Sequence, residues 1–394
     1  MEEKQQNTRS QRRSPVPKNR RLQGQILTIL LLGCVALFLI LGLCIPDRDF
    51  SESENRNLSK FPALSWNAVT DGSFFTDLSS YTADQFPGRD MWISLNLKLN
   101  QFLGHKDASG VYLCRDDYLM QIPSAPNEVQ LQRNLEAINT FGSTHQDMNV
   151  LVSIAPNAVT VLENKLPKNA PVRDQRADLA AIDSALTNAT FIDVTDTLTA
   201  NSQQQLYYRT DHHWTSLAAY YAFSQIAPSL GIHAPELDSY TRYTVSDSFE
   251  GTLSSKSGSH STRDTVEIFV PDTQIEYYVS YEGQEDICSM YVRSALDAKD
   301  HYTVFFGGNH PRVDITTTAD TGRSLLILKD SYANCMVQFL YPYFDHIVMV
   351  DPRYYYDNLE NAIRSEAVTD VLLLYNLDTF QSDSSLADVL NTGT

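Results

Sequence analysis

One long apolar run near the N-terminus separates a basic segment from the rest of the chain. Residues 26–45 read ILTILLLGCVALFLILGLCI, twenty residues with no charged side chain. A helix rises about 1.5 Å per residue, so this run is about 30 Å long and can cross a bilayer. A cleaved signal peptide has a shorter apolar core followed by small residues at the cut. The pattern therefore favours an uncleaved transmembrane anchor.

The charges on either side of this run predict its orientation. Seven basic and two acidic side chains lie in residues 1–25, whereas the run is followed by an acidic cluster of Asp47, Asp49, Glu52 and Glu54. Basic flanks stay in the cytoplasm, so the rest of the chain is expected outside it. We predict a basic cytoplasmic tail at 1–25, a transmembrane helix at 26–45, a charged stalk at 46–60, a folded ectodomain at 61–380 and a loose polar tail at 381–394.

The spacing of apolar residues in the ectodomain predicts alternating strands and helices. Intervals of three or four predict helices within 74–104, interrupted by a breaker at 84–90, and two short arms predict a hairpin at 109–121. Continuous apolar runs, typical of buried parallel strands, occur at 150–155, 191–194, 325–328, 347–350 and 371–375. Helices are expected at 215–226, 332–340 and 358–364.

Residues 240–320 differ from this pattern, since Thr, Ser, Tyr and Val dominate there and turns are frequent. They predict an antiparallel β-rich insertion or edge region. The strand–helix–strand order elsewhere predicts an α/β fold, with a parallel sheet covered by helices on both faces.

Charge and cysteine content exclude some classes of function. The net charge is −18 and the residues after 25 carry −23, so the body repels phosphate backbones and nucleic-acid binding is not expected. Of the five cysteines, Cys34 and Cys44 lie in the anchor. Cys114, Cys288 and Cys335 lack C-x-x-C spacing, which favours buried free thiols over disulfides or a thiolate zinc site.

Ser331 lies where a predicted strand passes into a helix, in the segment LKDSYAN. Such a turn exposes a side chain at the carboxyl end of a parallel sheet, and the free N–H groups of the helix start favour a developing oxyanion. An Asp-Ser pair before a helix is also a common cap, so this segment alone does not identify a nucleophile.

A second segment, RTDHHWT, supplies the base that a serine nucleophile requires. Asp211 and His213 are two residues apart, so in an extended segment they point to the same side, and the carboxylate can orient the imidazole. Trp214 is expected to wall the ring against water. The alternatives are a satisfied loop histidine and a metal site of Asp211, His212 and His213. Adjacent histidines of a strand face opposite ways, which disfavours the metal.

A third segment, FFGGNHP, offers hydrogen-bond donors after a predicted strand. Gly308 permits close backbone approach, and the Asn309 side chain can donate to an oxyanion. The backbone N–H of Ser331 or Tyr332 is the other expected donor. A simple Gly-Gly turn is the alternative.

Together these segments resemble the DHHW protein family, which is related to the SGNH-hydrolase-like alginate O-acetylation proteins AlgJ and AlgX. The resemblance rests on TDHHWT and KDSYAN, with support from ENR at 54–56, DQFPGR at 84–89 and DPRYY at 351–355, and covers about residues 48–380. It implies Asp211, His213 and Ser331 as a catalytic triad in a permuted SGNH order, since Asp-x-His precedes the serine. His212 occupies a variable motif position and receives no role.

The resemblance further implies a bacterial enzyme of the cell surface that needs no cofactor. It would transfer an acetyl group through acetyl-Ser331 to a polysaccharide, with a membrane-bound O-acyltransferase as acyl donor. Arg353 is a candidate substrate contact, although a surface ion pair is the simpler interpretation. A carbohydrate acetylesterase with the same triad and a non-catalytic scaffold for polysaccharide assembly are the competing hypotheses.

Overall fold

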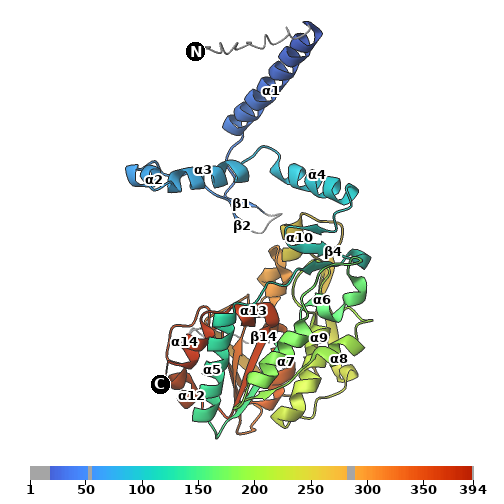
Figure 1. Ribbon diagram of the computed structural model, residues 1–394. Helices are drawn as coiled ribbons and strands as arrows, with labels where there is room; N and C mark the ends of the chain where they lie inside the picture. The colour runs from blue at the N-terminus through green and yellow to red at the C-terminus, as the bar shows by residue number, and fades with distance from the viewer. Residues whose placement is uncertain (1–17, 52–55, 282–288, 393–394) are drawn as a thin grey trace, which may run out of the picture. The chain divides into compact units, whose positions relative to one another are not determined.

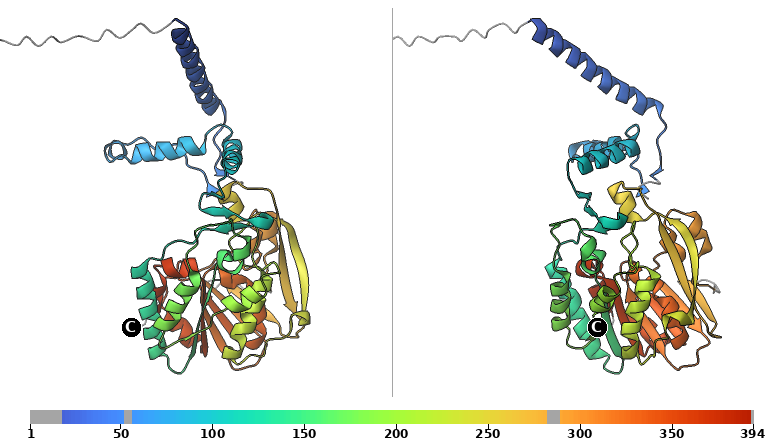
Figure 2. Two further views of the ribbon diagram at one scale, coloured as in Figure 1. Left: turned by 45° about the vertical axis from the view of Figure 1, so that its right-hand side comes forward. Right: turned by 90° about the vertical axis from the view of Figure 1, so that its right-hand side faces the viewer.

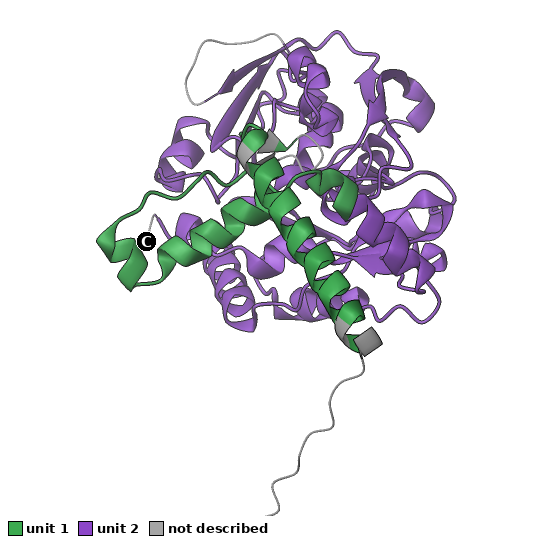
Figure 3. Ribbon diagram, turned by 90° about the horizontal axis from the view of Figure 1, so that it is seen from above, with its two compact units in different colours: residues 1–51, 56–92 green, residues 52–55, 93–394 purple. Residues whose placement is uncertain are grey.

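The computed structural model describes residues 18–51, 56–281 and 289–392. Most of the predicted basic tail, Cys288, and Glu54 and Asn55 of the ENR motif lie outside these residues. The chain divides into two compact units, residues 1–51 with 56–92 and residues 52–55 with 93–394 (Figure 3).

The first unit contains the apolar N-terminal helix. Helix α1 (Lys18–Cys44) holds a 21-residue stretch, Leu22–Gly42, with a mean hydropathy of 2.6. This stretch is long and apolar enough to cross a membrane, as the helix of a signal sequence also is. The same unit contains β1 (Phe50–Ser51), β2 (Arg56–Asn57), α2 (Trp66–Thr70) and α3 (Ser73–Asp84).

The segment that was expected to be a stalk is tied to this unit by hydrogen bonds. The Tyr81 hydroxyl donates to Asp47 at 3.0 Å, and the Gln85 amide donates to the carbonyl of Arg48 at 2.9 Å. The predicted breaker at 84–90 is shorter in the structure, because α3 ends at Asp84 and helix α4 (Arg89–Phe102) begins directly after the Pro87-Gly88 pair.

The second unit is built on a seven-stranded sheet in the order β10-β11-β13-β12-β14-β6-β7. Four predicted parallel strands are confirmed as β6 (Asn149–Ala155), β12 (Ser324–Lys329), β13 (His346–Val350) and β14 (Asp370–Asn376). The fifth, β7 (Thr190–Phe191), shares only Phe191 with the run predicted at 191–194. All five run parallel to one another, whereas β10 (Tyr277–Tyr281) and β11 (Arg312–Thr317) add an antiparallel edge next to β13.

Both faces of this sheet are buried, as Figures 1 and 2 show by the helices around it. Along β12, Leu325 and Ile327 belong to one apolar cluster, and Leu326 and Leu328 belong to another. Because neighbouring residues of a strand point to opposite faces, a continuous apolar run is what two covered faces require.

The helices divide between these two clusters. The Leu326 side is covered by α5 (Glu128–Thr144), α7 (Gln175–Ala185), α12 (Leu359–Ser365), α13 (Leu377–Ser382) and α14 (Leu386–Leu390). The other side is covered by α6 (Ala158–Val161), α8 (Thr195–Ala200), α9 (Ser216–Ile226) and α11 (Val337–Leu340). The predicted α/β class is thereby confirmed.

The region 240–320 is both an insertion and an edge. Strands β8 (Tyr240–Phe249) and β9 (Asp264–Pro271) pair only with each other, and α10 (Thr252–Ser257) connects them. Strands β10 and β11 of the same region belong to the main sheet. The predicted hairpin at 109–121 is confirmed as β4 (Val111–Leu113) and β5 (Leu119–Gln121), with β3 (Asp107–Ala108) alongside.

Three expectations for local structure were wrong. Residues 332–340 form a 3₁₀ turn at Ser331–Cys335 followed by α11 rather than one helix. Phe305 follows the 3₁₀ turn His301–Val304 and not a strand. The tail is not loose through residue 392, because Leu386 and Leu390 of α14 are buried against α5 and the sheet. Cys114 and Cys335 are free thiols, and Cys335 is buried as expected, whereas Cys114 is only partly buried.

Candidate active site

Ser331 lies at the carboxyl edge of the parallel sheet, directly after β12. Asp330 caps the 3₁₀ turn that Ser331 begins, because its carboxylate accepts from the backbone N–H of Tyr332 at 2.9 Å. The second oxygen of Asp330 accepts from the backbone N–H of Asn376 at the end of β14, also at 2.9 Å. The serine is thus fixed between two neighbouring strand ends, where α/β proteins form their sites.

The segment 209–215 reaches this edge as a turn and not as the extended chain that the spacing suggested. A bridge between Tyr207 and Trp214 closes the turn, and the Thr215 hydroxyl caps α9 by accepting from the N–H of Ala218. Asp264 of β9 holds the start of the turn, since one of its oxygens accepts from both the N–H and the hydroxyl of Thr210, at 2.7 and 2.6 Å. Residues from the β-rich region therefore position the turn.

Asp211, His213 and Ser331 form a continuous hydrogen-bonded line. The His213 ring lies 2.6 Å from Asp211 through Nδ1 and 2.7 Å from the Ser331 hydroxyl through Nε2. A carboxylate only accepts, so Nδ1 carries the proton and Nε2 is left to accept from the serine. This tautomer is the one in which an imidazole takes a proton from a nucleophile.

Besides His213, two residues that were not predicted, Gly251 and Thr252, hold the Asp211 carboxylate in place. Its Oδ2 accepts from both the N–H and the hydroxyl of Thr252 at 2.7 Å each, and its Oδ1 accepts from the N–H of His213 at 3.0 Å. Gly251 packs against it so closely that a Cβ at this position would lie 2.3 Å from the Asp211 Cβ. Position 251 therefore accepts only glycine without displacing the carboxylate.

Opposing effects set the ionisation of the acid and the base. Burial raises the pKa of Asp211, but the charges of His212 and His213 outweigh it and hold that pKa well below its ordinary value. Burial and the charge of His212 lower the pKa of His213 to about 4, against the attraction of Asp211. At neutral pH the site thus contains a carboxylate and a neutral imidazole, which is the state a general base requires.

The aromatic ring that covers His213 is Tyr302, not Trp214 as predicted. The Tyr302 ring stacks on the imidazole with centroids 3.9 Å apart and planes 13° from parallel, and its hydroxyl donates to the Ser331 carbonyl at 2.9 Å. Trp214 is fully buried and donates its indole N–H to the carbonyl of Tyr332 at 2.8 Å. Trp214 therefore connects the turn at 209–215, which contains His213, to the 3₁₀ turn that begins at Ser331.

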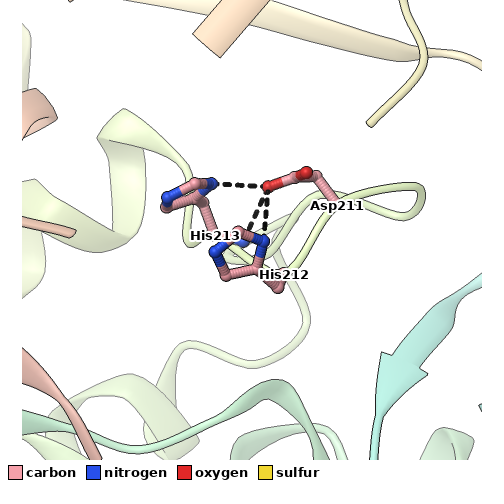
Figure 4. Close-up of side chains that lie close together, drawn as sticks. All are labelled: Asp211, His212 and His213. Atoms are coloured by element: carbon pink, nitrogen blue, oxygen red, sulfur yellow. Dashed lines mark hydrogen bonds and ion pairs between the residues drawn. The ribbon is translucent and has the colours of Figure 1, made fainter. Parts of the chain in front are cut away.

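His212 lies beside the base because the backbone turns between them. The centroids of the two imidazole rings are 3.9 Å apart. Figure 4 shows that one oxygen of the Asp211 carboxylate interacts with both rings. The expectation that adjacent histidines face apart was wrong, and potential ligand atoms of Asp211, His212 and His213 lie within 4.8 Å of one another. Both ring nitrogens of His213 are engaged by Asp211 and Ser331, however. A metal would have to break that line, so the contacts fit proton transfer better.

The third predicted segment, FFGGNHP at 305–311, contacts the 3₁₀ turn that begins at Ser331. Gly308 adopts φ +114°, a conformation that glycine permits, and its carbonyl accepts from the Asn334 side chain at 3.3 Å. The Asn309 Oδ1 accepts from Lys329 Nζ at 3.2 Å. The Tyr332 N–H is engaged by Asp330, so it is not a free donor, whereas the Ser331 N–H has no acceptor among the described residues.

Arg353 forms the ion pair that was the simpler interpretation of its position. Its Nε and Nη2 lie 2.8 and 2.6 Å from the two oxygens of Asp351, which is fully buried after β13. Such a two-point contact fixes the guanidinium plane. Its side chain remains 30% exposed beside the Tyr354 ring.

The fold and site define an α/β protein whose parallel sheet presents a serine at its carboxyl edge beside a histidine and an aspartate that precede it in sequence. The DHHW protein family model matches residues 128–350, more than half of the chain, and the chain belongs to this family.

Solved structures share the fold. A DHHW family protein from Eubacterium siraeum is 24% identical, with 72% of this chain and 95% of that chain covered and a TM-score of 0.62. Bacillus cereus PatB1 with a sulfonyl adduct is 18% identical, with 70% and 98% covered and a TM-score of 0.58. The O-acetyltransferase domain of Pseudomonas putida AlgJ is 15% identical, with 72% and 99% covered and a TM-score of 0.45. No curated protein sequence matches the chain.

Proposed function

We propose that this protein is a membrane-anchored serine acyltransferase that acts outside the cytoplasm and places an acetyl group on a hydroxyl of a cell-surface or secreted polysaccharide. The observation that carries the proposal is the position of the His213 ring, 2.6 Å from Asp211 and 2.7 Å from the Ser331 hydroxyl. A buried line of this kind has a direct chemical use, since it removes the proton that makes serine a weak nucleophile.

In the first half-reaction, Ser331 Oγ attacks the acetyl carbonyl carbon of the donor while His213 Nε2 takes the serine proton. Asp211 remains ionised and stabilises the imidazolium. The tetrahedral oxyanion accepts from the Ser331 N–H and the Asn309 amide. When the intermediate collapses, the bond to the donor oxygen breaks, His213 returns the proton to that oxygen, and acetyl-Ser331 remains.

In the second half-reaction, a sugar hydroxyl attacks acetyl-Ser331 and gives its proton to His213. Collapse of the second tetrahedral intermediate restores the Ser331 hydroxyl and releases the acetylated sugar. The choice of acetyl and of a polysaccharide rests on the DHHW motifs and their relation to alginate O-acetylation. The same relation supports a membrane-bound O-acyltransferase as donor, and the apolar stretch Leu22–Gly42 supports the anchor.

Covalent labelling of the full-length protein in detergent tests the nucleophile. A fluorophosphonate probe should label wild type at Ser331 and should not label Ser331→Ala. Ser184→Ala, which removes an exposed serine on α7, is the matched control and should label like wild type. A folded wild-type protein that stays unlabelled would favour the non-catalytic scaffold.

Product analysis separates transfer from hydrolysis, because both share the acetyl-serine. The protein is incubated with 4-nitrophenyl acetate and oligosaccharide acceptors, and the sugars are examined by mass spectrometry. Acceptors that gain the mass of one acetyl group, dependent on Ser331, support the transferase. Release of acetate alone at every acceptor concentration would support the acetylesterase instead.

A further inference from the structure

Lys329 is a buried cation two residues before the candidate nucleophile, and it lies outside the proton-transfer line. It is the last residue of β12, and only 1% of its surface is exposed. A buried ammonium is costly unless polar partners surround it. The partners of Lys329 therefore indicate what this charge is for.

The closest partners of Lys329 are two asparagine side chains. Its Nζ lies 2.8 Å from Asn334 Oδ1 and 3.2 Å from Asn309 Oδ1, whereas the nearest carboxylate oxygen, on Asp351, is 3.8 Å away. Asp351 is in turn engaged by Arg353 at 2.6 Å. The closest contacts of the ammonium are thus with neutral amides rather than with an acid.

These contacts fix which way each amide points. An ammonium has three donors and no acceptor, so the atom it meets on an asparagine must be oxygen. For Asn334, this leaves Nδ2 to donate to the Gly308 carbonyl at 3.3 Å and to Asn309 Oδ1 at 3.4 Å. For Asn309, Oδ1 thereby receives two donors, and Nδ2 has no acceptor among the described residues.

The backbone of the glycine loop adds to this arrangement. Phe306, Gly307 and Gly308 all have positive φ, at 62°, 75° and 114°. A buried phenylalanine in this conformation is strained and persists only where its surroundings hold it. Asn334 supplies one such contact through the Gly308 carbonyl. Lys329 and Asn334 therefore control both the place of Asn309 and the direction of its amide.

We propose that Lys329 is a positioning residue that aims the Asn309 amide at the carbonyl oxygen of the acyl group and places positive charge behind it. This rests on the proposed function. The substrate would meet Asn309, which is exposed, while Lys329 stays buried behind it. The ammonium polarises the Asn309 amide through Oδ1, which strengthens donation from Nδ2 as the oxyanion develops.

A double-mutant cycle in the full-length protein tests this assignment. Lys329→Met keeps the length of the side chain and removes its donors and charge, and Asn309→Ala removes the amide. With 4-nitrophenyl acetate, we expect Lys329→Met to lower kcat by about 10- to 100-fold and to change KM little, because the oxyanion forms only in the transition state. The double variant should be no slower than Asn309→Ala, since the lysine acts through the amide.

The controls separate positioning from folding. Lys168→Met, at an exposed lysine, should behave like wild type. Asn309→Asp keeps an oxygen for Lys329 to bind but loses the amide donor, so it should fold and should be as impaired as Asn309→Ala. This variant keeps the assignment testable if Lys329→Met does not fold.

Three results would overturn the assignment: independent, multiplying losses in the double variant, an effect of Lys329→Met on KM alone, or full activity of Asn309→Asp. The proposed function fails by a different result, namely unchanged activity and labelling of Ser331→Ala. A Ser331-dependent activity that does not respond to Lys329 would leave the function standing and remove only the positioning role.

Discussion

Two polar clusters flank Ser331, and they differ in charge. The proton side consists of Asp211 and a neutral His213, held by the segment 251–252 and by Asp264. The proposed oxyanion side consists of Asn309 and Asn334, whose side-chain oxygens accept from the Lys329 ammonium. A serine nucleophile needs negative charge behind its base and positive charge near the carbonyl it attacks. The two charged groups come from separate segments, Asp211 from the turn at 209–215 and Lys329 from the end of β12.

The largest effect is expected on the proton side, from Asp211→Asn. A carboxamide at this position leaves the imidazolium without its counter-charge and favours the wrong tautomer, so kcat should fall about 10⁴-fold. The rate with 4-nitrophenyl acetate and the melting temperature measure this. Asp196→Asn, at an exposed acid paired with Arg176, is the control. A loss of less than about tenfold in a folded variant would show that the proton side does not act as described.

A smaller effect is expected on the oxyanion side, from Asn309→Ala. Removal of one oxyanion donor should lower kcat by about 10²- to 10³-fold with little change in KM. Steady-state kinetics with the same ester measure this, and Asn361→Ala, at an exposed position of α12, is the control. If Asn309→Ala lowers kcat as much as Asp211→Asn does, the expected order of the two effects is wrong.

The smallest effect is a shift in pH dependence on replacement of His212. A general base works when deprotonated, so kcat/KM should rise with pH through the His213 pKa of about 4 and then level off. The charge of His212 is one cause of this low pKa. His212→Gln should therefore move the acid limb to higher pH, whereas His233→Gln, at an exposed histidine, should leave it in place. A limb that stays or moves to lower pH in His212→Gln would contradict this account.

The sequence predicted the parallel strands because each is a continuous apolar run of the length that a doubly covered sheet requires. Val150–Ala155 and Leu325–Leu328 lie within β6 and β12. The meeting of His213 with Ser331 was predicted as well, from a family resemblance and from the place of Ser331 after a strand.

The neighbours of the site escaped prediction because they depend on tertiary contacts. Tyr302 covers His213 from a segment 89 positions along the chain, whereas the adjacent Trp214 does not. Thr252 and Gly251 lie in the region of frequent turns, where no pattern connects them with Asp211. Readable signals were missed at two helices. In α5, Leu135, Ile138 and Phe141 are spaced by three, and in α14, Leu386, Val389 and Leu390 follow the three-and-four spacing of a buried helix.

The close contact between Gly251 and Asp211 has a consequence for other chains with this fold. A single methyl group at position 251 would overlap Asp211, at 2.3 Å from its Cβ and 2.6 Å from its Oδ2. A chain with the same fold and a larger residue there would be expected to have lost its proton relay and kept only its shape. One small residue, remote from Ser331 in sequence, is thus expected to decide whether such a chain can hold its acid in place.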